Sequence, residues 1–370
     1  MERFDVVVVG AGPSGSSAAR YLSEKGLRVL LMERKKLPRF KLCGGALSGR
    51  FSKYLPQDFK SKVLNVIHKG YLGFRGDKHK LKEREEVAYI IDRADFDHFL
   101  AQKAMEKGCE LREETELLDL WEEKGKIILD TTKGKVSCDF LIGADGFHSK
   151  VAKFLGFKKE KYYRSVEVLA EGEMDFNSVV IELGLVKRGY LWVFPKGNKL
   201  NIGVASTEKE NLLEVLKDYI KRQKIVKVKK IYKPKSWFIP FAEGSEELHT
   251  GRGRILLVGD AGNFVDPLLG EGIYYGYLSG LLAGDAILEN PQNPEKTYRK
   301  KVKELAKEFT YAGKIAKLAY RFQRVAYKMG GGTSLERYME FLKGHTTYEE
   351  MYKKGWLDFI KNLILYPLKS

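Results

Sequence analysis

The sequence predicts an α/β protein that combines a parallel sheet, an inserted antiparallel sheet and a helical C-terminal region. The first observation is an apolar run at 4–9, followed by a glycine-rich turn, a helical stretch and a second apolar run at 28–32, which is the order of a βαβ unit. The second is a change at 163–205 to short, strand-like segments rich in aromatic residues. The third is the helical pattern of 294–370, which is rich in Lys and Tyr.

The glycine-rich turn, Gly10 to Gly15, has the pattern G-x-G-x-x-G. Gly10 permits a tight turn, Gly12 allows the backbone to approach a pyrophosphate, and Gly15 allows helix and strand to pack closely. The free N–H groups at the start of the following helix, 16–25, face the phosphate charge. Glu33 closes the second strand, where its carboxylate can bind the hydroxyls of an adenosine ribose. This complete order predicts a Rossmann-type dinucleotide-binding domain.

The rest of the chain divides into recognisable elements. Before the inserted sheet we expect a glycine-rich loop at 37–49, a helical stretch at 51–70, a strand pair at 71–87, a helix at 94–108 capped by Asp95, a strand at 110–118, a hairpin at 121–135, a buried strand at 140–146 and a short helix at 149–155. After that sheet we expect a helix at 208–223, strands within 224–240, a buried strand at 254–259 and a helix at 272–288.

The predicted domains are a discontinuous nucleotide-binding domain of 1–70, 89–160 and 245–290, a substrate-binding sheet domain of 71–88 and 161–244, and a C-terminal helical region of 291–370.

Composition limits the classes of protein. Hydrophobic content of 44% and charged content of 31% are typical of a globular protein, and a net charge of +17 predicts a basic surface. That surface is either simply solvated or meets anionic lipid or phosphorylated substrates, and without a basic–aromatic module we expect no nucleic-acid partner. Cys43, Cys109 and Cys138 have no disulfide or metal spacing, so we expect no metal. With no signal peptide or spanning stretch visible, we expect a cytoplasmic protein, either free or lying on a membrane.

A second ligand-binding stretch follows the apolar run at 254–258. Gly259 and Asp260 end this strand, where a carboxylate can bind sugar-like hydroxyls, and Pro267 to Ile273 opens the next helix with glycines. Both features would lie at the same edge of the parallel sheet as the first glycine turn. Because NAD needs only the first βαβ unit and a partner half, this second clamp predicts a longer bipartite cofactor.

Four ordered motifs together resemble the FAD-binding set of p-hydroxybenzoate-hydroxylase-type flavoproteins: Gly10 to Gly15 with Glu33, Asp92-Arg93, Ala144-Asp145-Gly146 and Gly259-Asp260. The resemblance implies FAD as the cofactor, with Glu33 at the adenosine ribose, Arg93 on the pyrophosphate side and Asp260 at the ribityl chain. The cofactor-binding residues that it implies are Gly10, Gly12, Ser14, Gly15, Glu33, Arg34, Cys43, Gly44, Ala46, Arg93, Leu117, Asp145, Gly146, Gly259, Asp260, Gly270, Gly272 and Ile273, the last two against the isoalloxazine. For Asp145 the alternative is a strand-end cap.

Two more motifs resemble the geranylgeranyl reductase family within that group. Tyr190 to Gly197, followed by 201–204, is similar to its YxWxFPxG motif, and Lys41 to Gly45 is similar to its cysteine-glycine loop. Trp192 and Phe194 share one face of a strand, because side chains alternate, and could line an apolar channel for a prenyl chain. The alternative is that they form core of the inserted sheet. The predicted substrate-binding residues are Tyr190, Trp192, Phe194 and Pro195.

The resemblance implies reduction of C=C bonds in the geranylgeranyl chains of isoprenoid lipids, either an archaeal-type digeranylgeranylglycerophospholipid or geranylgeranyl diphosphate. Cys43 is the candidate catalytic residue, since its loop should approach the flavin and shape or tune the site; the alternative is packing as a small hydrophobe. The expected partners are a prenyl lipid and an electron donor such as ferredoxin or NAD(P)H, and no proton donor is identified. The alternatives are a flavin-dependent monooxygenase of the same fold, a prenylquinone reductase and a non-enzymatic lipid carrier.

The end of the chain predicts an amphipathic helix. One apolar face would carry Trp356, Phe359, Ile360, Leu363 and Ile364, with lysines on its flanks. Such a helix either lies on an anionic membrane surface or packs on the body of the protein.

Overall fold

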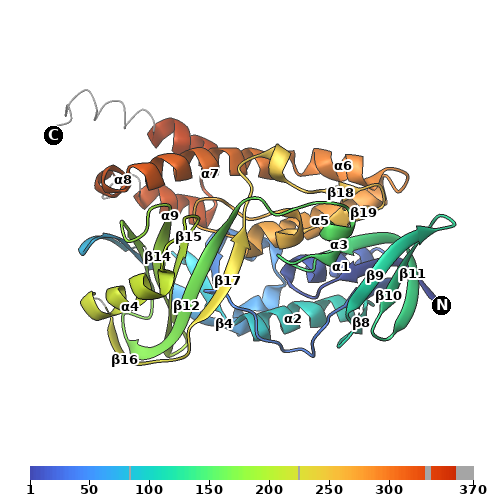
Figure 1. The fold of residues 1–370 in the computed structure, drawn as a ribbon, viewed down its shortest axis with the longest axis horizontal. Coiled ribbons are helices and arrows are strands. Elements are labelled where there is room, and N and C mark those ends of the chain that lie inside the picture. The colour runs from blue at the N-terminus through green and yellow to red at the C-terminus, as the bar shows by residue number, and fades with distance from the viewer. Residues whose placement is uncertain (83–84, 224–225, 330–334, 356–370) are drawn as a thin grey trace.

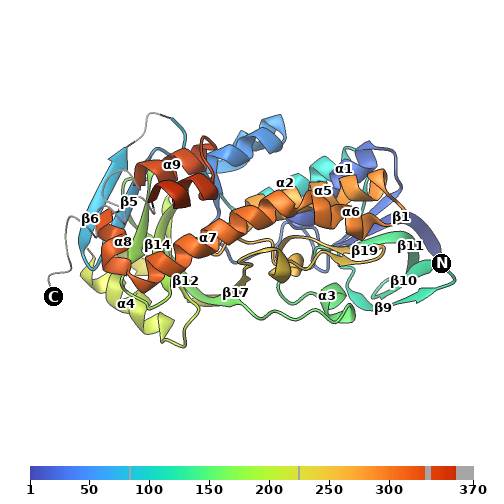
Figure 2. The same ribbon diagram turned by 90° about the horizontal axis from the view of Figure 1, so that it is seen from above.

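The structure, a computed structural model, describes residues 1–82, 85–223, 226–329 and 335–355. In Figure 1 the parallel sheet lies at the right, near the N-terminus, and the second sheet lies at the left. Helices α6 (Pro294–Lys301) and α7 (Lys303–Arg321) run along the top from one half to the other, which Figure 2 shows from above. The C-terminal helices therefore join the two sheets into one body.

The parallel sheet contains the βαβ unit that the sequence predicts. Its strands across the sheet are β8 (Glu110–Arg112), β2 (Val29–Met32), β1 (Glu2–Val9), β11 (Gly134–Gly143) and β19 (Ile255–Leu257), all parallel to their neighbours. A short antiparallel strand, β18 (Gly251–Arg252), continues it beyond β19. The predicted buried strands at 4–9, 28–32, 140–146 and 254–259 are thus confirmed as one sheet. Their carboxyl ends meet at one edge, where a ligand site is expected.

Helices cover one face of this sheet. Apolar side chains of β1, β2 and β11 pack there against α1 (Pro13–Glu24), α2 (Arg93–Met105) and α5 (Ile273–Glu289). The opposite face packs against the meander of β9 (Leu117–Glu123) and β10 (Lys126–Thr131) and against α3 (Lys150–Phe154). The sheet is buried on both faces, which explains its nearly continuous Val, Ile and Leu runs.

Glycines let α5 pack closely on α1. A Cβ at Gly280 would lie 2.2 Å from the carbonyl oxygen of Ser14, and a Cβ at Gly284 would lie 2.9 Å from the ring of Tyr21. The hydroxyl of Ser17 crosses the contact and donates to the carbonyl oxygen of Tyr277 at 2.8 Å. This close packing fixes the start of α5 beside the first glycine turn.

The stretch at 51–70 differs from the predicted helix. It contains two short 3₁₀ turns, Gly49–Tyr54 and Gln57–Lys62, and then β4 (Val63–Ile67), which pairs with β7 (Ala88–Ile91) beside β3 (Ala46–Ser48). Pro56 interrupts the helical pattern, and the β-branched residues of 63–67 favour a strand. The cap of α2 also differs, because Asp92 rather than Asp95 accepts the N–H of Ala94, at 2.8 Å.

The second sheet is antiparallel except for one pair of strands. Its order is β16 (Lys227–Ile231), β12 (Tyr162–Glu173), β15 (Lys199–Ser206), β14 (Gly189–Lys196), β13 (Ser178–Leu183), β5 (Lys69–Phe74) and β6 (Asp77–Lys82), and β17 (Lys235–Pro240) also pairs with β12. The parallel pair joins β5 to β13. One face packs against α4 (Leu212–Arg222), and the other packs against the C-terminal helices. The predicted inserted sheet is confirmed, with this parallel pair as the difference.

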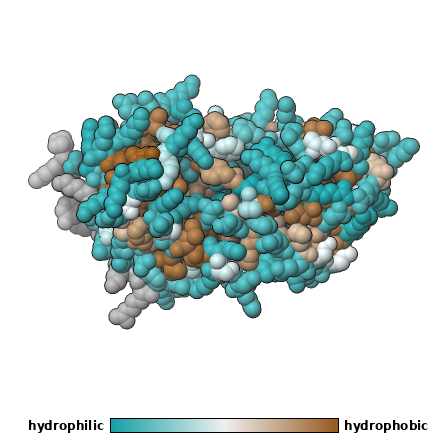
Figure 3. Space-filling model, turned by 90° about the horizontal axis from the view of Figure 1, so that it is seen from below, coloured by the Kyte–Doolittle hydropathy of each residue, from teal (hydrophilic) through white to brown (hydrophobic). Residues whose placement is uncertain are grey.

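The C-terminal region is helical in its described part. After α6 and α7 come α8 (Gln323–Met329), α9 (Leu335–Lys343) and helical residues 348–355. The predicted apolar helix face at 356–364 lies outside the described residues. Within the part of the chain that the structure describes, no helix is both long and apolar enough to cross a membrane. Hydrophilic side chains cover most of the face in Figure 3, with separate apolar clusters between them.

The two large sheets draw their strands from interleaved stretches of the chain. The parallel sheet uses residues before 33, between 110 and 143 and after 251, whereas the second sheet uses 69–82 and 162–240. These memberships support the proposed division into 1–70, 89–160 and 245–290, then 71–88 and 161–244, then 291–370.

Candidate cofactor and substrate site

The glycine turn between β1 and α1 is tightly packed at Gly15 and faces open space at Gly12. A Cβ at Gly15 would lie only 1.9 Å from the carbonyl oxygen of Gly10. A Cβ at Gly12 would instead have its nearest neighbours, the guanidinium nitrogens of Arg39 and Arg93, 3.9 Å away. Gly12 also caps the N-terminus of α1 without a side chain. The turn therefore faces an open space bordered by helix N–H groups and two cations.

A buried carboxylate, Asp97 of α2, holds both cations in place. Arg93 donates to it from Nε at 2.7 Å and from Nη2 at 2.9 Å, and Arg39 donates from Nη1 at 2.8 Å. Asp97 is fully buried. Burial alone would lower the pKa of Arg93, but the charge of Asp97 outweighs it and raises that pKa. Both guanidinium groups thus stay charged and fixed beside Gly12.

Sequence reasoning found Arg93 but missed Arg39 and Asp97. Asp97 follows Arg93 by four positions on one helix face, a spacing that the sequence does display. Arg39 comes from an irregular loop, where no periodic pattern indicates the direction of a side chain.

Glu33 ends β2 beside the glycine turn, at the position predicted for a ribose contact. Its carboxylate accepts the N–H of Ala11 at 3.3 Å, the N–H of Lys35 at 3.1 Å and Nε of Arg39 at 3.0 Å. An ionised carboxylate offers about four acceptor sites, so one remains for a further hydroxyl. Glu33 therefore supports the turn and keeps one acceptor site for a ligand hydroxyl.

The second clamp lies at the end of β19. Asp260 sits in the turn Gly259–Gly262, and a Cβ at Gly272, just before α5, would lie 3.6 Å from its Oδ1. Lys159 supports this turn by donating to the carbonyl oxygen of Ala261 at 2.6 Å and to Oδ1 of Asn263 at 2.7 Å. Burial lowers the pKa of Lys159 to about 8, although Asp260 opposes the shift. The predicted carboxylate and helix start are thus brought together.

The loop at 266–272, which leads into α5, is held by a buried carboxylate. Asp266 accepts the N–H of Leu268 at 2.7 Å, the N–H of Glu271 at 3.0 Å and the hydroxyl of Tyr348 at 3.1 Å. Burial raises the pKa of Asp266. Further tyrosines donate to loop carbonyls: Tyr163 to Pro267, Tyr190 to Leu269 and Tyr320 to Leu268. The second sheet and the C-terminal helices therefore fix the approach to the start of α5.

The cysteine-glycine loop lies directly on the aromatic strand β14. A Cβ at Gly44 would lie 2.9 Å from the ring of Phe194 and 3.3 Å from Nε1 of Trp192. The rings of Tyr190, Trp192 and Phe194 follow one another, with centroids 5.8 and 6.4 Å apart. Cys43 is partly exposed in this loop. The predicted aromatic row on one face of the strand is present.

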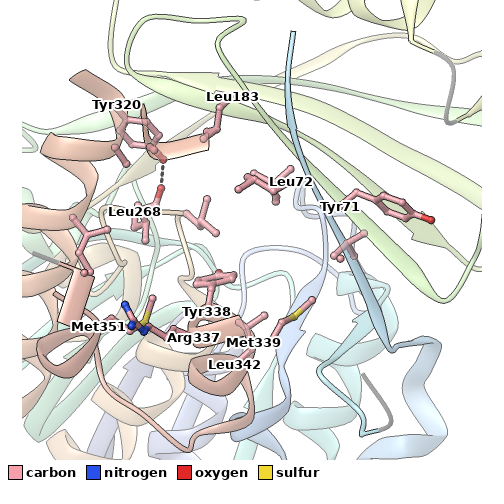
Figure 4. Close-up of a pocket in the computed structure, with 18 of the residues that line it drawn as sticks. Tyr71, Leu72, Leu183, Leu268, Tyr320, Arg337, Tyr338, Met339, Leu342 and Met351 are labelled. Atoms are coloured by element: carbon pink, nitrogen blue, oxygen red, sulfur yellow. Dashed lines mark hydrogen bonds between the residues drawn. The ribbon is translucent and has the colours of Figure 1, made fainter. Parts of the chain in front are cut away.

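An apolar cavity of about 290 Å³ lies between the second sheet and the C-terminal helices (Figure 4). Its lining includes Leu72 of β5, Leu183 of β13, Tyr320 of α7, and Met339 and Leu342 of α9. Leu268 and Leu269 also line it, so the cavity reaches the loop that leads into α5. Figure 4 shows the hydrogen bond from Tyr320 to Leu268 at this end.

The predicted substrate-binding residues lie beside this cavity rather than in it. Among the described residues that line it, Tyr190, Trp192, Phe194 and Pro195 do not occur. Trp192 and Phe194 face the cysteine-glycine loop instead, and Tyr190 donates to the carbonyl oxygen of Leu269 in the loop at 266–272. Pro195 does not share their side of β14, because alternation places it with Leu191 and Val193 toward α4. The structure therefore brings three of the four to the candidate site, and none of them to the cavity.

Comparison with known proteins decides the family. A family model described as an FAD binding domain matches residues 60–277, and another described as an FAD dependent oxidoreductase matches residues 5–66. The digeranylgeranylglycerophospholipid reductase of Methanosarcina mazei is 31% identical over 314 residues, which cover 78% of this chain and 76% of that protein. The chain belongs to the FAD-dependent geranylgeranyl reductase family.

Solved structures show the same fold. A geranylgeranyl bacteriochlorophyll reductase-like protein from Thermoplasma acidophilum has a TM-score of 0.79 at 22% identity, covering 98% of this chain and 99% of that one. The flavin-dependent brominase Bmp2 has a TM-score of 0.74 at 17% identity, covering 97% of this chain and 100% of that one. At these identities the likeness concerns the fold alone, and one fold serves both proteins.

The residues of this geranylgeranyl reductase family member fit its cofactor, FAD. The open space at Gly12, bordered by Arg39 and Arg93, suits a pyrophosphate, whose charge the guanidinium groups and the start of α1 can meet. Asp260 beside Gly272 suits a polyol and a polar ring edge at the start of α5. The protein is an FAD-dependent oxidoreductase, and these residues are the ones that would hold the cofactor.

Asp145 has the role of a cap in the structure. Its carboxylate accepts the hydroxyl of Ser149, the N–H of Lys150 at 2.7 Å and the N–H of Val151 at 3.3 Å. These are the first donors of α3, so the strand-end alternative describes its side chain. Its contact with FAD stays a prediction, as does that of the neighbouring Gly146.

The other predicted cofactor residues have varied surroundings. Ser14 lies against Gly259, where a Cβ would be 2.5 Å from its Oγ. Arg34 is exposed, and the carbonyl oxygen of the buried Leu117 accepts Nζ of Lys150 at 2.7 Å. Ala46 begins β3, Gly270 has a φ of +68°, and Ile273 is buried at the start of α5. Their cofactor contacts also stay predictions.

Proposed function

We propose that this protein saturates C=C bonds in the geranylgeranyl chains of an isoprenoid lipid. The observation that carries the proposal is the apolar cavity that reaches Leu268 and Leu269, on the loop that leads to the proposed flavin contacts at Gly272 and Ile273. Its volume is near the lower end of ligand pockets, about 300 Å³, and its lining is that of a site for a hydrocarbon chain. The names of relatives such as the Methanosarcina mazei reductase support the same substrate class.

The side chains around the cavity would hold the hydrocarbon and exclude water. Leu72 and Leu183 extend from the second sheet, and Met339 and Leu342 extend from α9, so apolar surface meets the chain from both sides (Figure 4). Burying a prenyl chain there releases water from both surfaces, which favours binding without directional contacts. The flexible methionine side chain of α9 can adapt to the position of the isoprene units.

The chain's own residues would orient the reaction. Bound FAD supplies hydride transfer, a chemistry that the protein side chains lack. Asp266 and its tyrosine donors fix the loop between the cavity and α5, so that an alkene held by Leu268 and Leu269 keeps one position relative to the start of that helix. An isolated alkene is not polarised, which makes this positioning the main contribution of the protein.

We extend the proposal to the partners. The substrate would be a digeranylgeranylglycerophospholipid or geranylgeranyl diphosphate, with a prenylated quinone as the alternative. The electrons would come from ferredoxin or NAD(P)H. We also propose that Cys43, in the loop that covers the aromatic row, contributes to the site beside the flavin.

The test is an anaerobic assay with the FAD-loaded full chain, reduced chemically so that the natural donor is not needed. The substrates are a digeranylgeranyl phospholipid, geranylgeranyl diphosphate and a prenylated quinone, each followed by mass spectrometry. We expect the lipid to gain two hydrogens per saturated bond. A product that instead gains oxygen when air is admitted, with no saturation under anaerobic conditions, would contradict the proposal and favour the monooxygenase.

A further inference from the structure

The turn at 270–272, which leads into α5, carries a single side chain. Its sequence is Gly-Glu-Gly, so Glu271 is the residue that can hold the turn from outside. Tyrosine hydroxyls hold the preceding part of the loop, at the carbonyl oxygens of 267–269. Asp266 binds the backbone of Glu271, but Asp266 belongs to the same loop. The side chain of Glu271 is therefore the contact that can fix this last part of the loop against the rest of the protein.

Two side chains from a distant part of the sequence hold this carboxylate. The hydroxyl of Ser48, the last residue of β3, donates to Oε1 of Glu271 at 2.5 Å. Nη2 of Arg50, which lies 221 residues before Glu271, donates to Oε2 at 2.5 Å. The same nitrogen donates to the hydroxyl of Tyr275 in the first turn of α5, at 3.2 Å. Both the turn and the start of the helix are thus tied to the segment that follows β3.

Aromatic rings enclose the guanidinium group of Arg50. Its central carbon lies 3.9 Å from the ring centroid of Phe341 in α9 and 4.3 Å from that of Tyr274 in α5. Within the part of the chain that the structure describes, Nε of Arg50 is buried and has no hydrogen-bond partner. The rings attract the cation, and the exclusion of water strengthens its ion pair with Glu271. Arg50 is thereby held between α9 and α5.

Helix α9 is also one wall of the apolar cavity. Leu342 of this helix lines the cavity, and a Cβ at Gly49 would lie 3.4 Å from its carbonyl oxygen. A Cβ at Gly344, just after the helix, would lie 3.0 Å from Cβ of Arg50. The segment that carries Arg50 therefore packs against the end of α9 while it holds the start of α5.

We propose that Glu271 is a positioning residue: held by Ser48 and Arg50, it sets the start of α5 against the flavin. The inference deepens the proposed function and rests on the proposed flavin contacts at Gly272 and Ile273. Free N–H groups at the start of a helix favour negative charge, and a flavin ring gains negative charge when it is reduced. A helix start that is held close to the ring therefore raises the reduction potential of bound FAD.

The test measures the reduction potential of the FAD-loaded full chain by equilibration with a reference dye. Glu271→Ala removes the carboxylate and its bonds, whereas Glu271→Gln removes the same charge but keeps an oxygen acceptor for Ser48 and Arg50. The difference between the two variants therefore reports the position of the turn and not the lost charge. We expect Glu271→Ala to favour the oxidised flavin about tenfold more than Glu271→Gln does, which is a potential lower by about 30 mV for two electrons.

Asp285 supplies the matched control, because it forms an ion pair with Lys301 at 2.6 Å near the other end of α5. Asp285→Ala and Asp285→Asn should have the same potential. A potential of Glu271→Ala that equals or exceeds that of Glu271→Gln would overturn the proposal. If either Glu271 variant does not fold or bind FAD, Ser48→Ala decides, since it changes no charge. A lower potential than in the unaltered protein then supports the proposal, and an unchanged one overturns it.

No lipid enters this assay, so its failure can be told apart from a failure of the proposed reductase activity. Equal potentials in the two Glu271 variants would leave the saturation of a prenyl lipid standing. A protein that saturates no lipid but shows the expected difference in potential would keep the positioning role of Glu271 and lose the proposed substrate.

Discussion

The cofactor cradle and the lipid cavity differ in how far apart their parts lie in the chain. The cradle begins with one continuous unit, residues 4–33, in which strand, glycine turn, helix and acid follow one another. The cavity takes its lining from β5, from β13 and from the consecutive helices α7, α8 and α9, and long stretches of chain separate these three parts. A site built from one unit leaves a pattern in the sequence, whereas a site built between distant elements exists only after folding.

The two regions also differ in what keeps them in place. Charged groups hold the cradle, with Asp97 fixing Arg39 and Arg93. Apolar packing holds the cavity, and polar bonds occur mainly at its end, where tyrosines hold the loop at 266–272. Changes in the cradle should therefore affect FAD, whereas changes in the cavity should affect the lipid.

The largest expected effect comes from Gly15→Ala. Its Cβ would lie 1.9 Å from a backbone oxygen of the turn itself, which cannot move aside. We expect a loss of more than about 4 kcal/mol in the free energy of unfolding, together with loss of bound FAD. Denaturant unfolding and the flavin absorbance measure the two.

Gly12→Ala in the same turn is the matched comparison. Its backbone is extended and its Cβ would meet no atom closer than 3.9 Å, so stability should change by less than about 0.5 kcal/mol. FAD affinity should still fall about tenfold or more, since the methyl group fills the open space. Unchanged FAD affinity in Gly12→Ala would remove this space from the cofactor site.

Asp97→Ala should have the next largest effect. It leaves the buried guanidinium group of Arg93 and the partly buried one of Arg39 without their shared partner, which should cost about 3 kcal/mol in the free energy of unfolding and weaken FAD binding. Asp95→Ala, at an exposed position of the same helix, is the control and should be close to neutral. Equal effects of the two substitutions in calorimetry and FAD titration would show that Asp97 does not hold the two arginines in place.

Leu72→Trp tests the other side of the comparison. The larger ring would enter the cavity from β5, so kcat/KM for a geranylgeranyl substrate should fall about tenfold while FAD content stays constant. Leu118→Trp, at an exposed position of β9, is the control. A loss of FAD together with activity would mean that the cavity belongs to the cofactor site.

The smallest expected effect is that of Tyr348→Phe. It removes one hydrogen bond to Asp266, worth about 1 kcal/mol, and should lower the melting temperature by about 2–4 °C. Tyr162→Phe, a partly exposed tyrosine of β12, should not change it. An unchanged melting temperature in Tyr348→Phe would show that the loop does not depend on the hydrogen bond from Tyr348.

The comparison also explains what the sequence could predict. The parallel sheet, the glycine turn, Glu33 and the second clamp followed from local patterns, because apolar runs and glycine spacing report local structure directly. Arg39 could not be found, since an irregular loop sets its direction. The helix expected at 51–70 failed because pairing with β7 decided the structure of 63–67.

The aromatic strand β14 also shows where prediction from the sequence stops. Alternation correctly placed Trp192 and Phe194 on one face, but it cannot say what lies opposite that face. The structure places the Cys43–Gly44 loop there, and the cavity opens farther along the sheet, toward β13 and β5. An apolar cavity is thus present, but Trp192 and Phe194, the residues that suggested a channel, do not line it.

The central claim is that the prenyl chain occupies the cavity between the second sheet and the C-terminal helices. The most direct measurement is photo-cross-linking of the FAD-loaded protein with a geranylgeranyl lipid that carries a diazirine on its last isoprene unit, followed by peptide mapping. If the prenyl chain lies there, adducts should form on the cavity lining, at Tyr71 and Leu72 or at Met339 and Leu342. Adducts confined to the aromatic strand, Tyr190 to Phe194, or spread over the surface without competition by unlabelled lipid, would contradict it.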